Sequence, residues 1–186
     1  MICIGFAECG KTVEQMHQTG INLRDCMMEK LCDDYSPQNI THTKKGKPLY
    51  QNIGFSVSHS HGAAACAVNI GREKKHITEN WLTLSGGENS AVGVDIEPID
   101  RNVDVKSLSK RFLSQKECEY VGLDNTRFLE IWTKKESACK LTGEGVTAIG
   151  LFCSLDTNSN ICIETKRVFV GNRKYIMSVA YYKTLD

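Results

Sequence analysis

The sequence predicts an α+β protein with two similar halves, and three observations favour this class. The last part of the chain, residues 149–182, reads as successive apolar strands separated by hairpin-type turns. Before it, residues 104–122 and 125–141 show the apolar periodicity of amphipathic helices. Strands of small residues occur late in each half, at residues 64–68 and 176–180. We therefore expect two α+β halves packed with pseudo-two-fold symmetry, with a ligand site in the cleft between them.

The N-terminal half is expected to span residues 1–91. In order, it should contain a short strand at residues 2–4, one or two helices up to about residue 34, a polar basic loop at residues 41–52 and two strands over residues 55–70. Residues 71–91 are polar and contain glycines, which indicates a loop, a hairpin extension or the junction between the halves.

The C-terminal half is expected to span residues 92–186. In order, it should contain a strand at residues 92–97, helices near residues 104–122 and 125–141, and strands at residues 151–155, 161–167 and 175–182. Gly143 and Gly145 should end the second helix, because glycine favours the left-handed backbone just beyond a helix C-terminus.

Composition and charge argue against several classes of protein. With 186 residues, 41% hydrophobic and 24% charged, the chain is long enough to bury a core. Its formal net charge of +1 gives no general attraction to nucleic acid or to a membrane surface. We expect neither a signal peptide nor a spanning helix, and hence a cytoplasmic protein. The nine cysteines form no C-x-x-C motif, so reduced thiols in the core are expected.

Two carboxylates occur on an apolar strand, Gly93-Val94-Asp95-Ile96-Glu97. Since successive side chains of a strand point to opposite faces, Asp95 and Glu97 should share one face, and Val94 and Ile96 the other. The alternative is that the two carboxylates simply form an exposed polar face of the strand.

A third carboxylate, Glu136, lies in the second predicted helix of the C-terminal half. Trp132, Glu136 and Lys140 are four residues apart and form one stripe. If this helix packs beside the strand, Asp95, Glu97 and Glu136 converge with the ammonium group of Lys140. Such a set suits a hard divalent cation, such as magnesium, that holds a phosphate. The alternative is a Glu136–Lys140 pair on an exposed helix surface, which stabilises a protein little.

A competing pattern occurs at the N-terminus. Gly5-Phe6-Ala7-Glu8-Cys9-Gly10-Lys11-Thr12 matches G-x-x-x-x-G-K-[ST], in which backbone N–H groups and a lysine cradle nucleotide phosphates. The strand that contains Asp95 could then supply the metal-binding aspartate of a P-loop nucleotide hydrolase. Two features oppose this. The strand before the first glycine is short, and the strand-rich end of the chain lacks the alternation of a parallel α/β fold.

Four segments occur in a fixed order along the chain. They are Gly46-Lys47-Pro48, Phe55-Ser56-Val57-Ser58-His59-Ser60, Gly93-Val94-Asp95-Ile96-Glu97 and Trp132-Thr133-Lys134-Lys135-Glu136-Ser137-Ala138-Cys139-Lys140. Together with Arg111-Phe112-Leu113-Ser114 and Glu117, this set resembles the 4′-phosphopantetheinyl transferase family, and most closely its surfactin-synthetase-activating type with two similar halves in one chain. The resemblance implies an enzyme of the holo-[carrier protein] synthase type. Such enzymes move the 4′-phosphopantetheine arm of coenzyme A to a serine of a carrier protein and release adenosine 3′,5′-bisphosphate.

The resemblance also implies roles for the carboxylates and for one lysine. Asp95, Glu97 and Glu136 would hold Mg²⁺ against the diphosphate of coenzyme A. Lys140 would bind this diphosphate and neutralise charge as the bond breaks. Glu136 would in addition take the proton of the attacking serine, as a general base.

Further matching positions imply contacts with coenzyme A in the N-terminal half. Lys47, Ser58 and His59 would hold its 3′-phosphate and nucleotide portion, and Pro48 would rigidify the turn that presents Lys47. Two other interpretations of the histidine are open. His59 could be a satisfied loop residue, or it could form a two-histidine metal site with His61.

The implied partners are coenzyme A and an apo acyl or peptidyl carrier protein, without nucleic acid or membrane, and a monomer is expected. Four basic side chains could attract an acidic carrier protein or could equally be solvated: Arg111, Lys116, Lys134 and Lys135. The N-terminal half is short compared with the family pattern, so the way in which it would bind coenzyme A is an open question. A non-catalytic relative that binds coenzyme A or a carrier is the remaining alternative.

Overall fold

The first half of the chain forms an antiparallel sheet with one long helix. The computed structural model describes residues 1–71, 81–85, 91–156 and 159–183. The elements of this half are β1 (Ile2–Glu8), α1 (Val13–Leu31), the 3₁₀ helix η1 (Pro37–Asn39), β2 (Thr41–His42), β3 (Pro48–Leu49), β4 (Gly54–Ser60), β5 (Ala63–Asn69) and β6 (Leu82–Leu84). The short strand β6 pairs with β1. It lies within residues 71–91, for which the sequence allowed a loop, a hairpin extension or the junction between the halves.

The second half forms a smaller sheet with three helices before its final hairpin. Its elements are β7 (Val92–Pro98), α2 (Val105–Phe112), α3 (Gln115–Val121), α4 (Asn125–Thr142), the 3₁₀ helix η2 (Val146–Leu151), β8 (Ile161–Val170) and β9 (Arg173–Tyr182). Among the described residues, no helix is both long enough and apolar enough to cross a membrane.

Both sheets place their strands in a related order. The first sheet has the order β4-β5-β1-β6 and the second has the order β7-β9-β8; β2 and β3 form a separate two-stranded ribbon. In each half the first strand pairs antiparallel with the second strand of a later hairpin, β1 with β5 and β7 with β9. The predicted mixture of helices and antiparallel strands is therefore confirmed.

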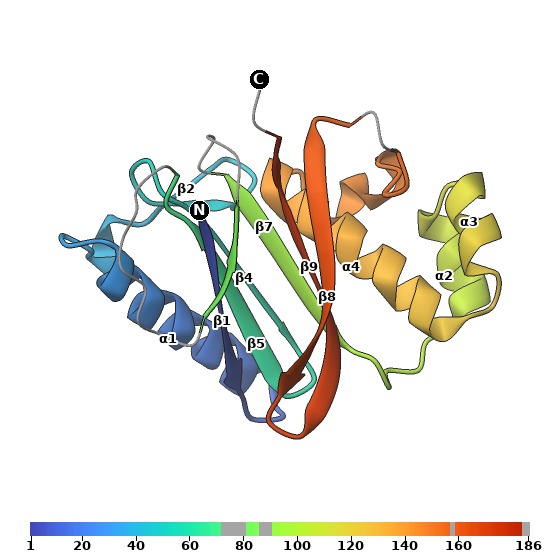
Figure 1. Cartoon of the computed structure of the whole chain (residues 1–186), viewed down its shortest axis with the longest axis horizontal. Helices are drawn as coiled ribbons and strands as arrows, with labels where there is room; N and C mark the ends of the chain where they lie inside the picture. Colours follow the sequence, from blue (N-terminus) through green and yellow to red (C-terminus); the bar gives the residue numbers. More distant parts are fainter. Residues whose placement is uncertain (72–80, 86–90, 157–158, 184–186) are drawn as a thin grey trace.

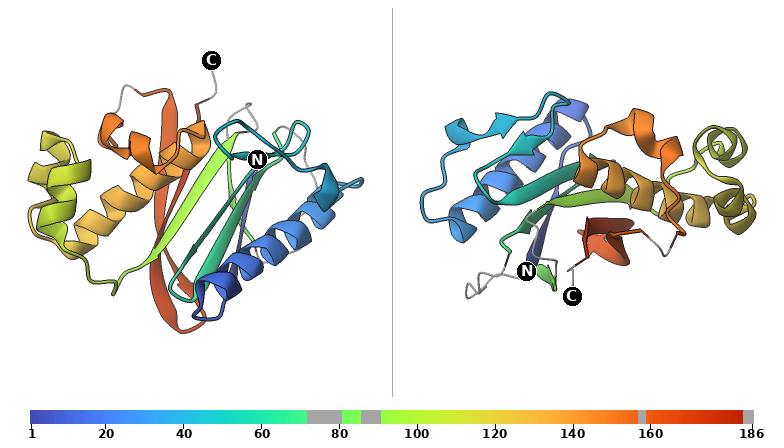
Figure 2. Two further views of the ribbon diagram at one scale, coloured as in Figure 1. Left: turned by 180° about the vertical axis from the view of Figure 1, so that it is seen from behind. Right: turned by 90° about the horizontal axis from the view of Figure 1, so that it is seen from above.

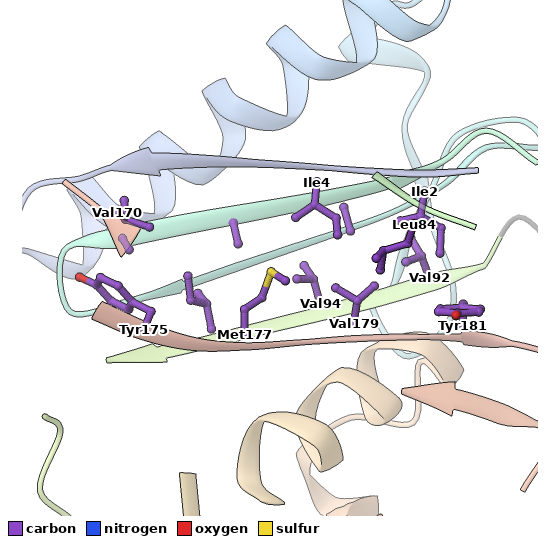
Figure 3. Close-up of a cluster of buried hydrophobic side chains, with 14 residues drawn as sticks. Ile2, Ile4, Leu84, Val92, Val94, Val170, Tyr175, Met177, Val179 and Tyr181 are labelled. Atoms are coloured by element: carbon purple, nitrogen blue, oxygen red, sulfur yellow. The ribbon is translucent and has the colours of Figure 1, made fainter. Parts of the chain in front are cut away.

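The main apolar cluster lies between the two sheets, and the long helices cover their outer faces (Figures 1 and 2). Figure 3 shows Ile2 and Ile4 of β1 on one side of this cluster, with Val94 of β7 and Met177 and Val179 of β9 on the other. Helix α1 packs on β4 and β5, whereas α4 packs on β7 and β9. The edge strands β4 and β7 lie side by side, so the two halves meet along them.

Strand β1 is longer than predicted and removes the structural basis of the phosphate-loop pattern. It continues through Gly5 to Glu8 and pairs antiparallel with both neighbours, β5 and β6. Helix α1 then begins after Thr12, whose side chain accepts a hydrogen bond from the Gln15 backbone N–H in a capping box. A nucleotide-binding loop needs residues 5–12 to wrap around a phosphate after a parallel strand, and four of them lie in this antiparallel strand instead.

Two other predicted elements differ from the structure. The helix predicted at residues 104–122 is divided into α2 and α3, because Ser114 caps α3 in a second capping box with Glu117. The strand predicted at residues 151–155 is wrong. This segment ends η2 and then turns, and its Phe152 carbonyl accepts a hydrogen bond from Lys135 instead of pairing in a sheet.

Candidate active site

Helix α4 lies directly against β7, and a glycine permits this approach. Gly93 is buried in β7, and a Cβ atom at its position would lie 2.0 Å from the Ser137 carbonyl oxygen and 2.5 Å from the Leu141 backbone nitrogen. Any side chain there would push the helix away from the sheet. The close contact sets Glu136 and Lys140 of α4 beside the polar face of β7.

Strand β7 separates apolar from acidic side chains, as its alternation requires. Val94 and Ile96 belong to the apolar cluster between the sheets. Asp95 and Glu97 point to the other face and are also buried, with exposed fractions of only 5% and 7%. The alternative of an exposed polar strand face is therefore wrong. Buried carboxylates need compensating partners, which the neighbouring strand and helix provide.

Every second residue of β4 contributes a hydroxyl group that hydrogen-bonds to β7. The pairs are Ser56 with the Val94 N–H (3.1 Å), Ser58 with Asp95 Oδ1 (2.8 Å) and Ser60 with Glu97. Since β4 belongs to the first half and β7 to the second, these hydroxyl groups join the two halves at the acidic residues.

Lys140 completes the contacts of Asp95. Its Nζ lies 2.7 Å from Asp95 Oδ1 and 2.9 Å from the Ser58 hydroxyl oxygen. The other carboxylate oxygen, Asp95 Oδ2, is buried and has no hydrogen-bond partner among the described residues. Oδ1 of Asp95 thus already accepts two hydrogen bonds, whereas Oδ2 can still ligate a cation or accept a hydrogen bond.

Glu97 and Glu136 both have pKa values above the ordinary range. Burial raises the pKa of Glu97, although a hydrogen bond from Ser60 and the positive charge of Arg101 oppose this. The Arg101 guanidinium also forms an ion pair with Glu97. Burial raises the pKa of Glu136 to about 7, and the negative charge of Asp95 adds to the effect. Three carboxylates thus lie close enough to repel one another, which a bound cation would relieve.

The donor set matches a hard divalent cation in chemistry. Among the described residues, no group of three or more acidic, histidine or cysteine side chains lies close enough together to hold a metal ion. The oxygens of Asp95, Glu97 and Glu136 are nevertheless the ligand type that Mg²⁺ prefers. The unpartnered Oδ2 of Asp95 is an acceptor that a cation would satisfy. The residues therefore fit Mg²⁺, although their present conformation is not a closed metal site.

A pocket of about 290 Å³ opens beside these residues. It is lined on one side by the basic turn at Lys45, Lys47 and Pro48, and on the other by Glu136 and Lys140 of α4. The structure thus brings the predicted coenzyme-binding turn and the predicted catalytic helix to one cavity.

The position of the basic turn is fixed by the end of α4. The Lys47 ammonium donates a hydrogen bond to the Leu141 carbonyl, and its methylene groups lie against Gly143. Burial lowers the pKa of Lys47, so this lysine is poorly solvated even though it lines the pocket. Gly143 itself has φ +74°, as expected for the residue that ends the helix.

The structure does not bring His59 into this pocket. The ring of His59 lies against α1, where its centroid is 6.0 Å from that of His17. Burial, followed by the charge of His17, lowers the pKa of His59. Strand alternation explains the separation, because neighbouring residues of β4 point to opposite faces. Ser58 therefore faces Asp95 while His59 faces the first helix.

A buried ion pair between α3 and α4 was missed by sequence reasoning. Lys135 and Glu117 are both fully buried, and Lys135 Nζ lies 2.9 Å from Glu117 Oε2. Although burial opposes ionisation, hydrogen bonds from Ser114, Ser154 and Lys135 lower the pKa of Glu117. Both alternatives given for Lys135, attraction of a carrier protein and simple solvation, are therefore wrong. The capping pattern Ser114-Gln115-Lys116-Glu117 was the available signal for the buried carboxylate.

Residues 91–177 match the family model of the 4′-phosphopantetheinyl transferase superfamily. Over this part, the chain is similar to that superfamily. The matched region runs from the start of β7 into β9 and contains Asp95, Glu97, Glu136 and Lys140. The resemblance stated from the ordered motifs is thereby confirmed.

Two curated relatives point to the same superfamily. The 4′-phosphopantetheinyl transferase HetI of Nostoc sp. (strain PCC 7120) is 29% identical over 119 residues, which cover 58% of this chain and 43% of HetI. The 4′-phosphopantetheinyl transferase gsp of Aneurinibacillus migulanus is 31% identical over 119 residues, which cover 59% of this chain and 40% of gsp. The chain spans about two fifths of the length of these superfamily members.

Proposed function

We propose that the chain transfers the 4′-phosphopantetheine arm of coenzyme A to a serine of an acyl or peptidyl carrier protein. The second product is adenosine 3′,5′-bisphosphate. One observation carries this proposal within the superfamily: the basic turn at Lys47 and the helix that bears Glu136 and Lys140 line the same pocket. An anionic coenzyme and an attacking hydroxyl group need this combination of cations and a base.

The proposal treats the chain as two related halves, residues 1–91 and 92–186, with pseudo-two-fold symmetry and the site in the cleft between them. The related strand orders of the two sheets support the symmetry. The pocket supports the position of the cleft, because Lys47 and Pro48 come from the first half and Glu136 from the second. The hydrogen bonds between β4 and β7 would keep the two sets of residues in register.

In this proposal Asp95, Glu97 and Glu136 would hold Mg²⁺. When bound, the cation would neutralise charge on the diphosphate of coenzyme A and lower the barrier to its cleavage. The raised pKa values of Glu97 and Glu136 support the assignment, since both reflect buried acidic groups without enough positive charge nearby.

Glu136 would act as the general base. Its pKa of about 7 in the metal-free protein suits this role, because the carboxyl group is partly ionised near neutral pH and can still bind a proton. The carrier serine would lose its proton to Glu136, and its oxygen would form a bond to the phosphorus that bears the pantetheine arm. The bond from this phosphorus to the bridging oxygen would break, and the electron pair would leave with adenosine 3′,5′-bisphosphate. Lys140 would neutralise the negative charge that develops there.

The remaining predicted contacts concern the nucleotide end of coenzyme A. Lys47, held in place by the rigid Pro48, would bind a phosphate at the pocket wall. We keep Ser58 and His59 as proposed contacts, although their side chains point in different directions. His59 would need a ligand that reaches around the edge of β4 to the side of α1.

The proposed setting is a monomer in the cytoplasm whose partners are coenzyme A and an apo carrier protein, without nucleic acid or membrane. The nine cysteines are all free, which fits a reducing compartment. Lys134, partly buried on α4, and the exposed Arg111 and Lys116 are proposed to attract an acidic carrier.

A transfer assay tests the proposal. The chain is mixed with Mg²⁺, coenzyme A and an apo carrier protein, and the carrier should gain the mass of one phosphopantetheine arm. Asp95→Ala should abolish the gain, whereas Lys110→Ala, a change of an exposed residue of α2, should not. Binding of coenzyme A without any gain in carrier mass would favour the non-catalytic alternative. Nucleotide hydrolysis that depends on Lys11 would revive the P-loop alternative.

A further inference from the structure

Three elements converge on a single oxygen atom of Asp95. Lys140 of α4 donates to Asp95 Oδ1 at 2.7 Å, and Ser58 of β4 donates to the same atom at 2.8 Å. Lys140 and Ser58 also contact each other at 2.9 Å, so the three groups form a closed triangle. The Lys140 side chain is 30% exposed and lines the pocket, whereas that of Asp95 is only 7% exposed. The ammonium group is therefore the movable member of the triangle.

We infer that Lys140 is an exchangeable counter-ion: it neutralises Asp95 in the ligand-free protein, leaves Asp95 when a divalent cation binds, and is thereby released to bind the diphosphate of coenzyme A. This inference rests on the proposed function, which assigns the cation to Asp95 and the diphosphate to Lys140. It adds that one lysine cannot serve both partners at the same time.

The contacts of the carboxylate explain why the exchange is needed. Oδ1 already accepts two hydrogen bonds, and Oδ2 is buried without a partner among the described residues. Lys140 and Arg101 together balance two charges, while Asp95, Glu97 and Glu136 supply up to three. A divalent cation satisfies this set better, but it would repel an ammonium group that stayed within hydrogen-bond distance of the same carboxylate.

The released side chain has a short path to its second role. Lys140 already lines the pocket that also contains Lys47, so a rotation of its flexible four-carbon stem would turn the ammonium group into the cavity. Cation binding would thus increase the affinity for an anionic coenzyme through Lys140. By thermodynamic linkage, coenzyme binding would increase the affinity for the cation by the same factor.

The first test measures binding of Mg²⁺ alone by isothermal titration calorimetry, without coenzyme A. Lys140→Met removes the competing ammonium group and should bind Mg²⁺ about tenfold more tightly than the wild type, within the usual range of coupling between sites. Lys140→Arg keeps the charge and should stay near the wild-type affinity. Lys110→Met removes an equal charge from an exposed position and controls for the general effect of charge. Equal or weaker binding by Lys140→Met would overturn the inference.

The second test follows Lys140 in the unaltered protein. Reductive methylation of lysines, read by mass spectrometry for each residue, is compared with and without Mg²⁺. Lys140 should be methylated faster when Mg²⁺ is present, because the ammonium group has left Asp95, while Lys110 should not change. Unchanged or slower methylation of Lys140 at a saturating Mg²⁺ concentration would overturn the inference.

The outcomes separate the inference from the proposed function. If the wild type transfers the phosphopantetheine arm and binds Mg²⁺, but either test on Lys140 fails to give the expected change, only the inference fails. If the wild type neither binds Mg²⁺ nor modifies a carrier protein, the proposed function fails and the inference with it.

Discussion

The helices that cover the two sheets are held in different ways. Helix α1 buries Met27, Met28 and Leu31 in an apolar cluster on the first sheet. Helix α4 buries apolar side chains too, but it adds fully buried polar contacts, whereas the hydrogen bond that Tyr35 donates to Asp25 of α1 is only partly buried. Its Thr133 hydroxyl lies 2.8 Å from the Ser178 hydroxyl of β9, and its Lys135 is fully buried against an acidic partner.

This difference indicates which helix needs a defined orientation. Apolar contacts are non-directional, so they hold a helix on a sheet without strongly fixing its rotation. Hydrogen bonds and charge-assisted pairs depend on angle as well as distance, and they fix both. Helix α4 carries the proposed base Glu136 and the proposed phosphate ligand Lys140, whereas α1 carries none of the proposed catalytic or metal-binding residues. A site on α4 needs side chains held to within a fraction of an ångström.

In each half a glycine lies where the long helix approaches the sheet. This glycine is on the helix in the first half and on the sheet in the second. In the first half Gly20 lies on α1, and a Cβ atom there would be 2.8 Å from a methyl group of Val57. In the second half Gly93 lies on β7, and a Cβ atom would be 2.0 Å from the backbone of Ser137. A side-chain methyl group can move aside, while a helix backbone can shift only if α4 shifts as a whole.

The largest expected effect on stability comes from removing the buried charge of Lys135 on α4. Lys135→Met should lower the free energy of unfolding by about 3–5 kcal/mol, because Glu117 stays buried without its cation. Urea denaturation followed by circular dichroism measures the change. Lys134→Met, a partly buried neighbour on the same helix, should cost less than about 0.5 kcal/mol. Adding Glu117→Gln to Lys135→Met should recover part of the loss. Equal effects of the two single lysine changes would contradict the contrast between the helices.

The two glycines allow a matched comparison. Gly93→Ala should destabilise the protein by about 3 kcal/mol, because the new methyl group meets backbone atoms of α4. Gly20→Ala should cost less, since it meets a single movable methyl group of Val57 and gains the helix propensity of alanine. Thermal unfolding of both variants measures the difference. A larger loss for Gly20→Ala would refute the view that α4 is the more tightly fitted helix.

The smallest of these effects depends on pH. In the folded protein burial raises the pKa of Glu136 from its ordinary value of 4.5 to about 7, so folding disfavours the ionised form. Without metal, Glu136→Gln should therefore be more stable than the wild type above pH 7, by about 1–3 kcal/mol after allowance for partial exposure. The advantage should disappear as the pH falls toward 4.5, where the wild-type carboxyl is neutral in both states. Urea denaturation at several pH values checks this, and a constant difference would argue against the raised pKa.

Much of the local structure could be predicted because its causes are local. Alternation on β7 placed Asp95 and Glu97 on one face, and the four-residue spacing on α4 placed Glu136 and Lys140 on one stripe. Capping patterns could also have located the break between α2 and α3, because Ser114 and Glu117 satisfy each other's backbone donors.

The rest depends on long-range contacts that the sequence does not reveal. The burial of Lys135 follows from its contacts with Glu117 of α3 and with the Phe152 carbonyl, which lie 18 and 17 residues away on either side of it in the chain. The link between Lys47 and the end of α4 likewise joins residues 94 positions apart. The separation of His59 from Ser58, by contrast, could have been predicted from strand alternation, since the two residues are adjacent on β4.

The central claim is that Glu136, held between β7 and the pocket, performs the proton transfer of a phosphopantetheinyl transfer. The most direct measurement is the rate of carrier modification by Glu136→Gln and by the wild type, with coenzyme A and Mg²⁺ in excess. We expect a loss of about 10²–10⁴-fold in kcat for the variant. The wild-type rate should fall at acidic pH as Glu136 becomes protonated, with a midpoint below the metal-free value of about 7 because Mg²⁺ favours the ionised carboxylate. Transfer by Glu136→Gln at the wild-type rate and with the same pH profile would contradict it.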